Sequence, residues 1–441
     1  MKIGKRTLSS PQTIVLGFAA VILTGALILM MPVSSAKGTG TPFVDSLFTA
    51  TTSVCVTGLV TVDTGSHWSA FGHAVILLLM QTGGLGVVTL AASFMMMAGR
   101  KIGLLQRSTM QDAVSAHKLE GIVRLTGFII KGTLLIELIG AAVMAPTFIR
   151  DFGWARGLWF AVFHSVSAFC NAGIDLMGCQ EPFSSLTSYV GNIPVNVTIM
   201  SLIVIGGIGF LTWDDIVTHK HRLRSYRMQS KVILVTTGLL ILIPAAGFFF
   251  LEFSHMPLTE RILASLFQSV TPRTAGANTV DLGAMSEAGQ MIMIVLMLIG
   301  GSPGSTAGGM KTTTFAVILA CAAAVFRKRD SAQFFGRRVA HDVITTACTV
   351  AFMYVGICVG GAMIISLVEG LPILTCMYET ASAVATVGLS LGITPGLSSF
   401  SKFLLIAMMY IGRVGGLTLI YAAMNVPACP GRLPLENITV G

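Results

Sequence analysis

The sequence predicts an all-α membrane protein with eight transmembrane helices, arranged as four helix, pore-loop, helix repeats around a central pore. Three observations support this fold class: an apolar composition, basic residues in alternate segments, and a glycine-centred segment that occurs four times. Of the 441 residues, 54% are hydrophobic and 11% are charged, and the mean hydropathy is +0.81. Soluble domains carry about 25% charged residues, so this chain belongs in a lipid bilayer.

Eight apolar runs are long enough to cross the hydrocarbon layer of a membrane, which takes about 20 helical residues. An even number of spans places both termini on the same side. The runs begin near positions 12, 70, 121, 190, 230, 286, 340 and 400.

Lysine and arginine residues gather in every second segment between these runs, within a formal net charge of +9. The positive-inside rule assigns these segments and both termini to the cytoplasm, and this arrangement argues against nucleic-acid binding. The basic residues are Lys2, Lys5 and Arg6, then Arg100, Lys101, Arg107, Lys118 and Arg124, then Lys220, Arg222, Arg224, Arg227 and Lys231, and finally Arg327, Lys328, Arg329, Arg337 and Arg338.

Two loops share the pattern G-x-x-T-V-D, at positions 58–63 and 276–281, and similar glycine-centred segments occur at 171–175 and 385–390. The four glycines, Gly58, Gly173, Gly276 and Gly388, recur at intervals of 103 to 115 residues. An aromatic residue, Phe48, Phe163, Phe267 or Tyr378, stands nine or ten positions before each one. It opens a stretch rich in Ser, Thr and Ala that is long enough for only a half-spanning helix.

A further glycine cluster follows in the next apolar run of each copy, for example Gly83-Gly84-Leu85-Gly86. Each copy therefore predicts an outer helix, a re-entrant helix, a glycine loop and an inner helix. The predicted divisions are repeat 1 at 1–99, repeat 2 at 100–219, repeat 3 at 220–329 with a gating loop at 300–311, repeat 4 at 330–426, and a C-terminal tail at 427–441.

The four glycine loops predict an ion selectivity filter. Irregular backbone at membrane depth must be buried in protein or line a water-filled path, and backbone carbonyls can replace the water that a cation sheds. Glycine allows the φ values that turn carbonyls toward an axis. The predicted filter residues are Val56, Thr57, Gly58, Asn171, Ala172, Gly173, Thr274, Ala275, Gly276, Thr386, Val387 and Gly388, with K⁺ at the four glycines. Thr386-Val387-Gly388 repeats the first three letters of the T-V-G-Y-G potassium-channel filter.

Charged residues near these loops allow two interpretations. Asp63, Asp175 and Asp281 could concentrate cations at the mouth or simply solvate their loops. Glu379 and Arg273 lie inside re-entrant segments, where an unpaired charge is expensive, so we expect them to brace the loops, although the sequence does not indicate their partners.

A glycine-rich run interrupts the third inner helix and predicts a flexible gate below the filter, because it cannot stay helical. Lys311 and Arg413 are cations within spans, and either close the gate electrostatically or help to pack it. The predicted gate residues are Gly300, Gly301, Ser302, Pro303, Gly304, Ser305, Thr306, Ala307, Gly308, Gly309, Lys311 and Arg413. The run also resembles a phosphate-binding P-loop, but Met310 separates Gly309 from Lys311 and no strand precedes it.

The chain resembles the Ktr/Trk/HKT superfamily of potassium transporters, and within it the membrane subunits of bacterial Ktr systems. The resemblance covers nearly the whole chain and rests on Thr57-Gly58-Leu59 with Val62-Asp63, Ser167-Ala168-Phe169 with Asn171-Ala172-Gly173, Thr271 to Gly276, Glu379 with Thr386 to Leu389, and Ile411-Gly412-Arg413.

This resemblance implies gated K⁺ uptake in a bacterial inner membrane and leaves open whether Na⁺ is also required. It further implies a homodimer on a cytoplasmic ring of KtrA-like RCK nucleotide-binding subunits, so that nucleotide acts only through the partner.

Two other functions fit the sequence less well. A secondary transporter built from inverted repeats is disfavoured, because each predicted repeat contains two spans and all four share one orientation. An enzyme is disfavoured because His67, His164 and the eight cysteines form no H-E-x-x-H, G-x-S-x-G or metal-ligand pattern.

Overall fold

The computed structural model describes residues 9–87 and 121–423, with the short pieces 2–3, 6–7, 89, 91 and 108–111. The predicted C-terminal tail at 427–441 lies outside the described residues. Eight helices begin within three residues of the predicted span starts, at positions 10, 70, 122, 193, 228, 287, 341 and 399.

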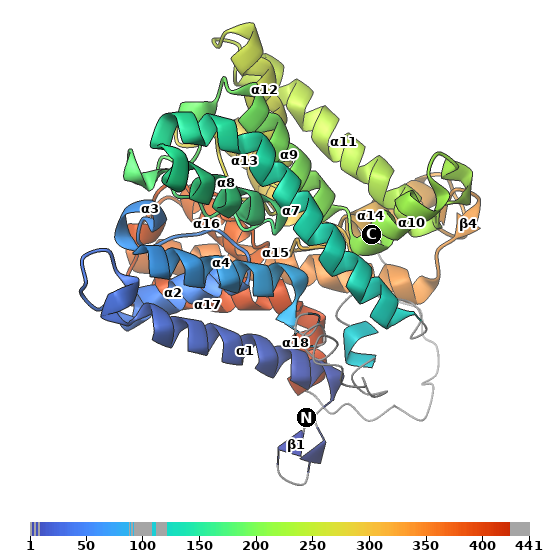
Figure 1. Cartoon of the computed structure of the whole chain (residues 1–441). Coiled ribbons are helices and arrows are strands. Elements are labelled where there is room, and N and C mark those ends of the chain that lie inside the picture. The colour runs from blue at the N-terminus through green and yellow to red at the C-terminus, as the bar shows by residue number, and fades with distance from the viewer. Residues whose placement is uncertain are drawn as a thin grey trace.

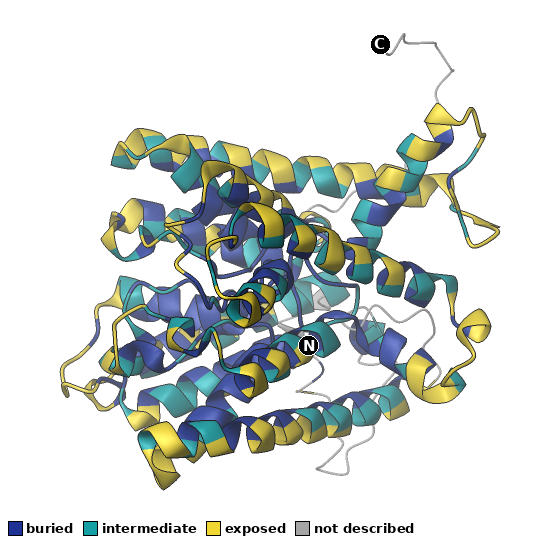
Figure 2. Cartoon of the chain, turned by 90° about the horizontal axis from the view of Figure 1, so that it is seen from above, coloured by how far each residue is buried: buried dark blue, intermediate teal, exposed yellow. Residues whose placement is uncertain are grey.

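Four long helices are apolar enough to cross a membrane: α1 (Ser10–Leu29), α7 (Ile122–Phe152), α11 (Met228–Leu251) and α15 (His341–Glu369). We call them the outer helices. Their outward faces are largely exposed (Figure 2). Among the exposed residues are large apolar ones such as Leu138, Leu242 and Phe352. Such surfaces are unfavourable in water and suit the acyl chains of a bilayer.

A short helix follows each outer helix: α2 (Phe43–Val54), α8 (Trp154–Phe169), α12 (Leu258–Val270) and α16 (Ile373–Val384). They contain 12 to 16 residues, and at 1.5 Å per residue they reach about 18 to 24 Å. These helices therefore end within the membrane thickness, and each leads into one of the glycine loops. We call them the pore helices.

Each unit continues into an inner helix: α4 (Ala70–Leu85), α9 (Ile193–Gly207), α13 (Glu287–Leu298) or α17 (Ser399–Val414). Three of the inner helices are interrupted at glycine residues, whereas the sequence predicts such a break only for the third. Gly209 and Gly415 take positive φ where α9 meets α10 (Phe210–His219) at 97° and α17 meets α18 (Gly416–Ala423) at 92°. The loop 299–311 separates α13 from α14 (Thr312–Phe326).

The four units close into a ring. Figure 1 shows where the ring closes, with the red α17 of the last unit beside the blue α2 of the first. Each inner helix contacts the pore helix of the following unit: α4 contacts α8, α9 contacts α12, and α13 contacts α16. The last inner helix, α17, contacts α2 of the first unit, and α18 contacts α1. The chain thus returns to its beginning, with the ends of the pore helices at the centre.

Small elements precede the first outer helix or lie between the helices named above. They are α3 (Thr64–His67), the hairpins β1 (Lys2–Ile3) with β2 (Arg6–Thr7) and β3 (Gln333–Phe334) with β4 (Arg337–Arg338), and the 3-10 turns Pro32–Ser34, Met177–Cys179, Thr187–Tyr189, Leu223–Ser225 and Thr394–Gly396.

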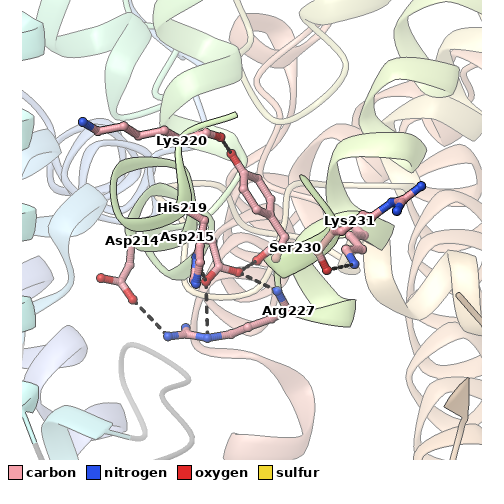
Figure 3. A network of polar contacts seen from close by, with 9 residues as sticks. Asp214, Asp215, His219, Lys220, Arg227, Ser230 and Lys231 are labelled. Carbon is pink, nitrogen blue, oxygen red and sulfur yellow. Dashed lines mark hydrogen bonds and ion pairs between the residues drawn. The ribbon is translucent and has the colours of Figure 1, made fainter. Parts of the chain in front are cut away.

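A polar cluster holds α10 against α11 (Figure 3). The fully buried Asp215 carboxylate accepts hydrogen bonds from the Ser230 hydroxyl at 2.6 Å and the Arg227 backbone amide at 3.0 Å. The Arg227 side chain also pairs with the exposed Asp214 at 3.0 Å. The last segment of the second unit is thereby fixed to the first helix of the third.

Candidate ion filter and gate

The four predicted glycines meet at the centre of the ring, and each has positive φ: +100° for Gly58, +63° for Gly173, +77° for Gly276 and +95° for Gly388. A Cβ atom on any of them would collide with a backbone carbonyl oxygen of the next loop. The collisions pair Gly58 with Ala172, Gly173 with Ala275, Gly276 with Val387, and Gly388 with Thr57. This order closes on itself, so the loops follow one another around one axis in chain order.

The residue two positions before each glycine is also left-handed, with φ of 49° at Val56, 58° at Asn171, 66° at Thr274 and 53° at Thr386. A positive φ is uncommon in residues other than glycine and is costly for β-branched ones. Alternating backbone conformations of this kind turn successive peptide groups to the same side. The same strain at four equivalent positions points to a functional requirement.

The amides of these loops point back to the pore helices. Thr57 donates to the Thr52 carbonyl at 2.8 Å, Ala172 to Ser167 at 2.8 Å, Ala275 to Thr271 at 2.9 Å, and Val387 to Ser382 at 2.8 Å. Within the described part of the chain, the carbonyls of these four donors accept no hydrogen bond. Four free carbonyl oxygens therefore surround the axis, where they can bind a cation.

One hydroxyl from each pore helix supports its loop. Thr52 and Ser382 accept hydrogen bonds from the Gly58 and Gly388 amides, both at 2.9 Å. Ser167 donates to the Ile174 carbonyl at 2.7 Å, and Thr271 donates to the Ala277 carbonyl. The sequence does not single out these hydroxyls as supports of the loops, although each stands four positions after the aromatic residue of its pore helix.

Three further hydroxyls near the ring, those of Thr57, Thr274 and Thr386, are buried with no hydrogen-bond partner among the described residues. A buried polar group normally has a partner. Neutral carbonyl and hydroxyl oxygens suit a dehydrated monovalent cation, so the donor set fits the predicted cargo.

A cavity of about 430 Å³ lies on one side of the ring, and all four glycines line it. Asp63, Asp175 and Asp281 also line it. Burial, with a smaller contribution from the Asp63 carboxylate, raises the pKa of Asp175 to about 6. The carboxylates also make local bonds: Asp63 accepts from the Phe183 amide at 3.0 Å, and Asp281 from the Gly283 amide at 2.9 Å. Both interpretations of these aspartates are consistent with this geometry.

The loop 299–311 lies against the other side of the ring. A Cβ atom on Gly308 would collide with the Thr386 hydroxyl. The Thr306 hydroxyl lies 3.0 Å from both the Phe169 carbonyl and the Asn171 side-chain oxygen. The predicted gate loop is thus in direct contact with the second and fourth glycine loops.

This loop is held by the break in the second inner helix. Ser302 and Thr306 donate their amides to the carbonyls of Gly207 and Gly206, at 2.9 and 3.2 Å. In return, the Phe210 amide donates to the Gly304 carbonyl at 2.7 Å. These bonds give the loop one defined position although it is rich in glycine.

Both predicted gate cations bind backbone carbonyls. The Lys311 amine donates to Ala307 at 2.9 Å and Gly308 at 3.3 Å, within its own loop. The Arg413 guanidinium donates to Thr306 and Gly83, and to Gly84 at 3.3 Å. Both cations line a second cavity, of about 320 Å³, on this side of the ring.

The bracing residues also have identifiable contacts. Glu379 is fully buried and accepts hydrogen bonds from the Ser390 hydroxyl at 2.5 Å and the Thr394 hydroxyl at 2.8 Å, beyond its own glycine loop. The Arg273 carbonyl accepts from the Asn171 side chain at 3.2 Å, while two of its guanidinium nitrogens have no partner among the described residues.

A third acidic residue lies in the core of the membrane part. Glu137 stands in the middle of α7 and is buried, so its side chain does not reach the membrane interface. Its carboxylate accepts a hydrogen bond from Gln81 on α4 at 3.3 Å. Hydropathy does not show which face of a helix meets protein.

Comparison with known proteins agrees with this geometry. The TrkH family, described as cation transport proteins, matches residues 9–428. The chain is 38% identical to the potassium/sodium uptake protein NtpJ of Enterococcus hirae, over 99% of this chain and 98% of that protein. It is 37% identical to the Ktr system potassium uptake protein B of Bacillus subtilis, over 98% of this chain and 96% of that protein.

The fold is similar to the crystal structure of the potassium transporter TrkH from Vibrio parahaemolyticus, with a TM-score of 0.74 and 17% identity, over 96% of this chain and 86% of that one. The predicted resemblance to Ktr membrane subunits is confirmed. This chain is therefore a multi-pass membrane protein, not an enzyme, and belongs to the TrkH family of cation transport proteins.

Proposed function

We propose that this chain is the ion-translocating subunit of a Ktr-type complex and mediates potassium-selective, gated uptake driven by the membrane potential. The observation that carries the proposal is the closed ring of free carbonyls from Thr57, Ala172, Ala275 and Val387. Peptide oxygens held at fixed positions can replace the hydration shell of K⁺ without placing a charge in the membrane.

In this proposal, the four predicted repeats with their eight spans surround one pore. The ion enters through the aspartate-lined cavity, passes the glycine ring and meets the loop 300–311, which closes the path with Lys311 and Arg413. By the positive-inside rule, both termini and the gate side face the cytoplasm of a bacterial inner membrane. The chain forms a homodimer on a KtrA-like ring, and nucleotides act through that partner.

The membrane potential is sufficient as a driving force. An inside-negative potential supplies about 2.3 kcal/mol per charge per 100 mV. At about 1.4 kcal/mol per tenfold change, this allows roughly fifty-fold accumulation of a monovalent cation. A gated passive pore therefore needs no direct use of ATP.

Flux measurements on the purified chain in liposomes test the proposal. KCl-loaded vesicles are diluted into potassium-free medium with a protonophore and a pH-sensitive dye, so that K⁺ efflux draws protons inward and quenches the dye. We expect quenching with K⁺-loaded vesicles and much less with Na⁺-loaded ones. Flux that requires a gradient of a second ion, whatever the potential, would instead indicate a secondary transporter.

Sodium is the second ion to examine, since the Enterococcus hirae relative is named for potassium and sodium uptake. Adding Na⁺ to the external solution at fixed K⁺ gradient and potential separates a sodium requirement from sodium permeation. A requirement raises K⁺ flux, whereas permeation alone adds a Na⁺ current.

A further inference from the structure

Two pore-helix residues occupy matching positions behind opposite loops of the filter. His164 and Glu379 each follow the aromatic residue of their pore helix, Phe163 and Tyr378. Both side chains are buried, with 3% and 0% exposure. Neither is among the groups that face the axis.

Each of these side chains accepts a hydrogen bond from the backbone amide three residues after its filter glycine. The Leu176 amide donates to His164 Nε2 at 3.3 Å. The Leu391 amide donates to Glu379 Oε1 at 3.1 Å. The two loops are thus fixed at the same point although the side chains differ.

The contacts of His164 define its tautomer. Its Nδ1 atom lies 2.7 Å from the Phe160 carbonyl, which can only accept, so Nδ1 carries the proton. Nε2 is then free to accept from Leu176. The ring therefore links the body of α8 to the outer edge of the second loop.

The corresponding residues of the other two pore helices make no such link. Thr49 donates its hydroxyl to the Asp45 carbonyl, at 2.8 Å, within its own helix. The polar atoms of Gln268 are buried without a hydrogen-bond partner in the described part of the chain. The first and third loops therefore lack this attachment.

The order of the glycine ring places the second and fourth loops opposite each other across the axis. Where the size of a carbonyl ring sets the preference for K⁺, loops that resist moving inward keep the ring too wide to coordinate the smaller Na⁺. The attachments at His164 and Glu379 therefore fix two loops that face each other across the axis, which keeps the distance between these loops constant.

We propose that His164 and Glu379 are matched positioning residues that hold the outer edges of the second and fourth loops and thereby contribute to K⁺ over Na⁺ selectivity. This inference rests on the proposed function. It predicts that selectivity depends on the hydrogen bonds to Leu176 and Leu391 rather than on the charge of Glu379.

The test measures K⁺ and Na⁺ flux in liposomes for the full-length chain and its variants. His164→Leu and Glu379→Leu remove the acceptors, whereas His164→Gln and Glu379→Gln keep one. A buried hydrogen bond contributes about 1 kcal/mol, so we expect the leucine variants to lower the K⁺/Na⁺ flux ratio about five- to tenfold. The glutamine variants should stay within about twofold of the wild type.

Thr49→Val is the matched control, because it removes a polar group at the same pore-helix position of a loop without the attachment. Its flux ratio should not change. Replacing the Leu176 or Leu391 amide by an ester, through an α-hydroxy acid, removes the donor while leaving every side chain unchanged, and should reproduce the leucine variants. This second measurement decides the question if a leucine variant fails to fold.

A glutamine variant that falls as far as its leucine variant, or an ester without effect, would overturn the proposal. These outcomes leave the proposed function intact provided that the wild type conducts K⁺ in preference to Na⁺. A wild-type chain that shows no such preference would instead refute the proposed function.

Discussion

The Arg413 guanidinium joins the fourth inner helix to the Thr306 carbonyl of the loop below the filter. The same group donates to Gly83 and Gly84 of the first inner helix. One side chain therefore ties the first and fourth units to the loop 299–311, the proposed gate. If this loop is the gate, as proposed, the arrangement favours a role for Arg413 in holding it by hydrogen bonds as well as by charge.

Arg413→Ala should release the loop. Hydrogen bonds from a charged group contribute about 1.5–3 kcal/mol each, so losing several should raise K⁺ flux without a regulatory subunit by about tenfold or more. Arg413→Lys should be intermediate, because lysine cannot reproduce the planar donor geometry. Liposome flux checks this, with gel filtration to confirm assembly. A variant that conducts like the wild type would leave Arg413 with a packing role only.

Thr306→Val tests the attachment of the loop to the filter. The change keeps the shape but removes the hydroxyl contacts with Phe169 and Asn171, so flux without a partner should rise several-fold. Ser305→Ala is the control, since the Ser305 hydroxyl bonds to no described residue other than Ser302, which lies inside the loop at 2.6 Å. Shortening the run from Gly300 to Gly309 should raise flux further, and lower flux in the shortened protein would argue against a gate here.

Gly58→Ser should weaken the K⁺ over Na⁺ preference, because the new Cβ atom collides with the Ala172 carbonyl. Gly58→Ala should do the same. Gly38→Ala is the matched control: Gly38 has a similar positive φ, +67°, but nothing lies within 4 Å of its Cβ position. That variant should lose only about 1 kcal/mol of stability and keep its ion preference. If the Gly58 and Gly38 variants had the same K⁺ over Na⁺ selectivity, the first loop would not be part of the filter.

Glu137→Ala should destabilise the protein by about 2–4 kcal/mol, because it leaves a cavity and an unpaired Gln81 amide in the core. Glu137→Gln should cost less than about 1 kcal/mol, since it preserves the volume and an acceptor. Thermal unfolding in detergent measures both. Leu138→Ala, on the exposed face of the same helix, should have little effect on stability. A loss of stability as large as that of Glu137→Ala would indicate that α7 is sensitive to any truncated side chain.

Asp215→Asn should loosen the junction of α10 and α11 by about 1–3 kcal/mol, because it weakens the hydrogen bonds that the buried Asp215 carboxylate accepts from the Ser230 hydroxyl and the Arg227 amide. Asp214→Asn should change stability by no more than about 0.5 kcal/mol, because its ion pair with Arg227 is exposed. The comparison is made by thermal unfolding of full-length protein. If both substitutions had the same effect, burial of Asp215 would not be the reason for its contribution.

Local patterns determine the membrane class, the helix starts and the four glycine loops, because hydropathy and the nine or ten positions from each aromatic residue to its glycine are set within a few helical turns. The sequence also indicates where the third inner helix breaks, since no helix persists through residues 300–309.

Contacts between distant segments depend on packing. Three features show this: the hydrogen bond from Leu176 to His164, the bond from Arg413 to Gly83, and the burial of Glu137 beside Gln81. Each of them depends on residues of different helices or loops. Only the tertiary structure decides them, because a hydrogen bond depends on where two groups lie in space and the sequence pattern of either segment carries no record of its partner.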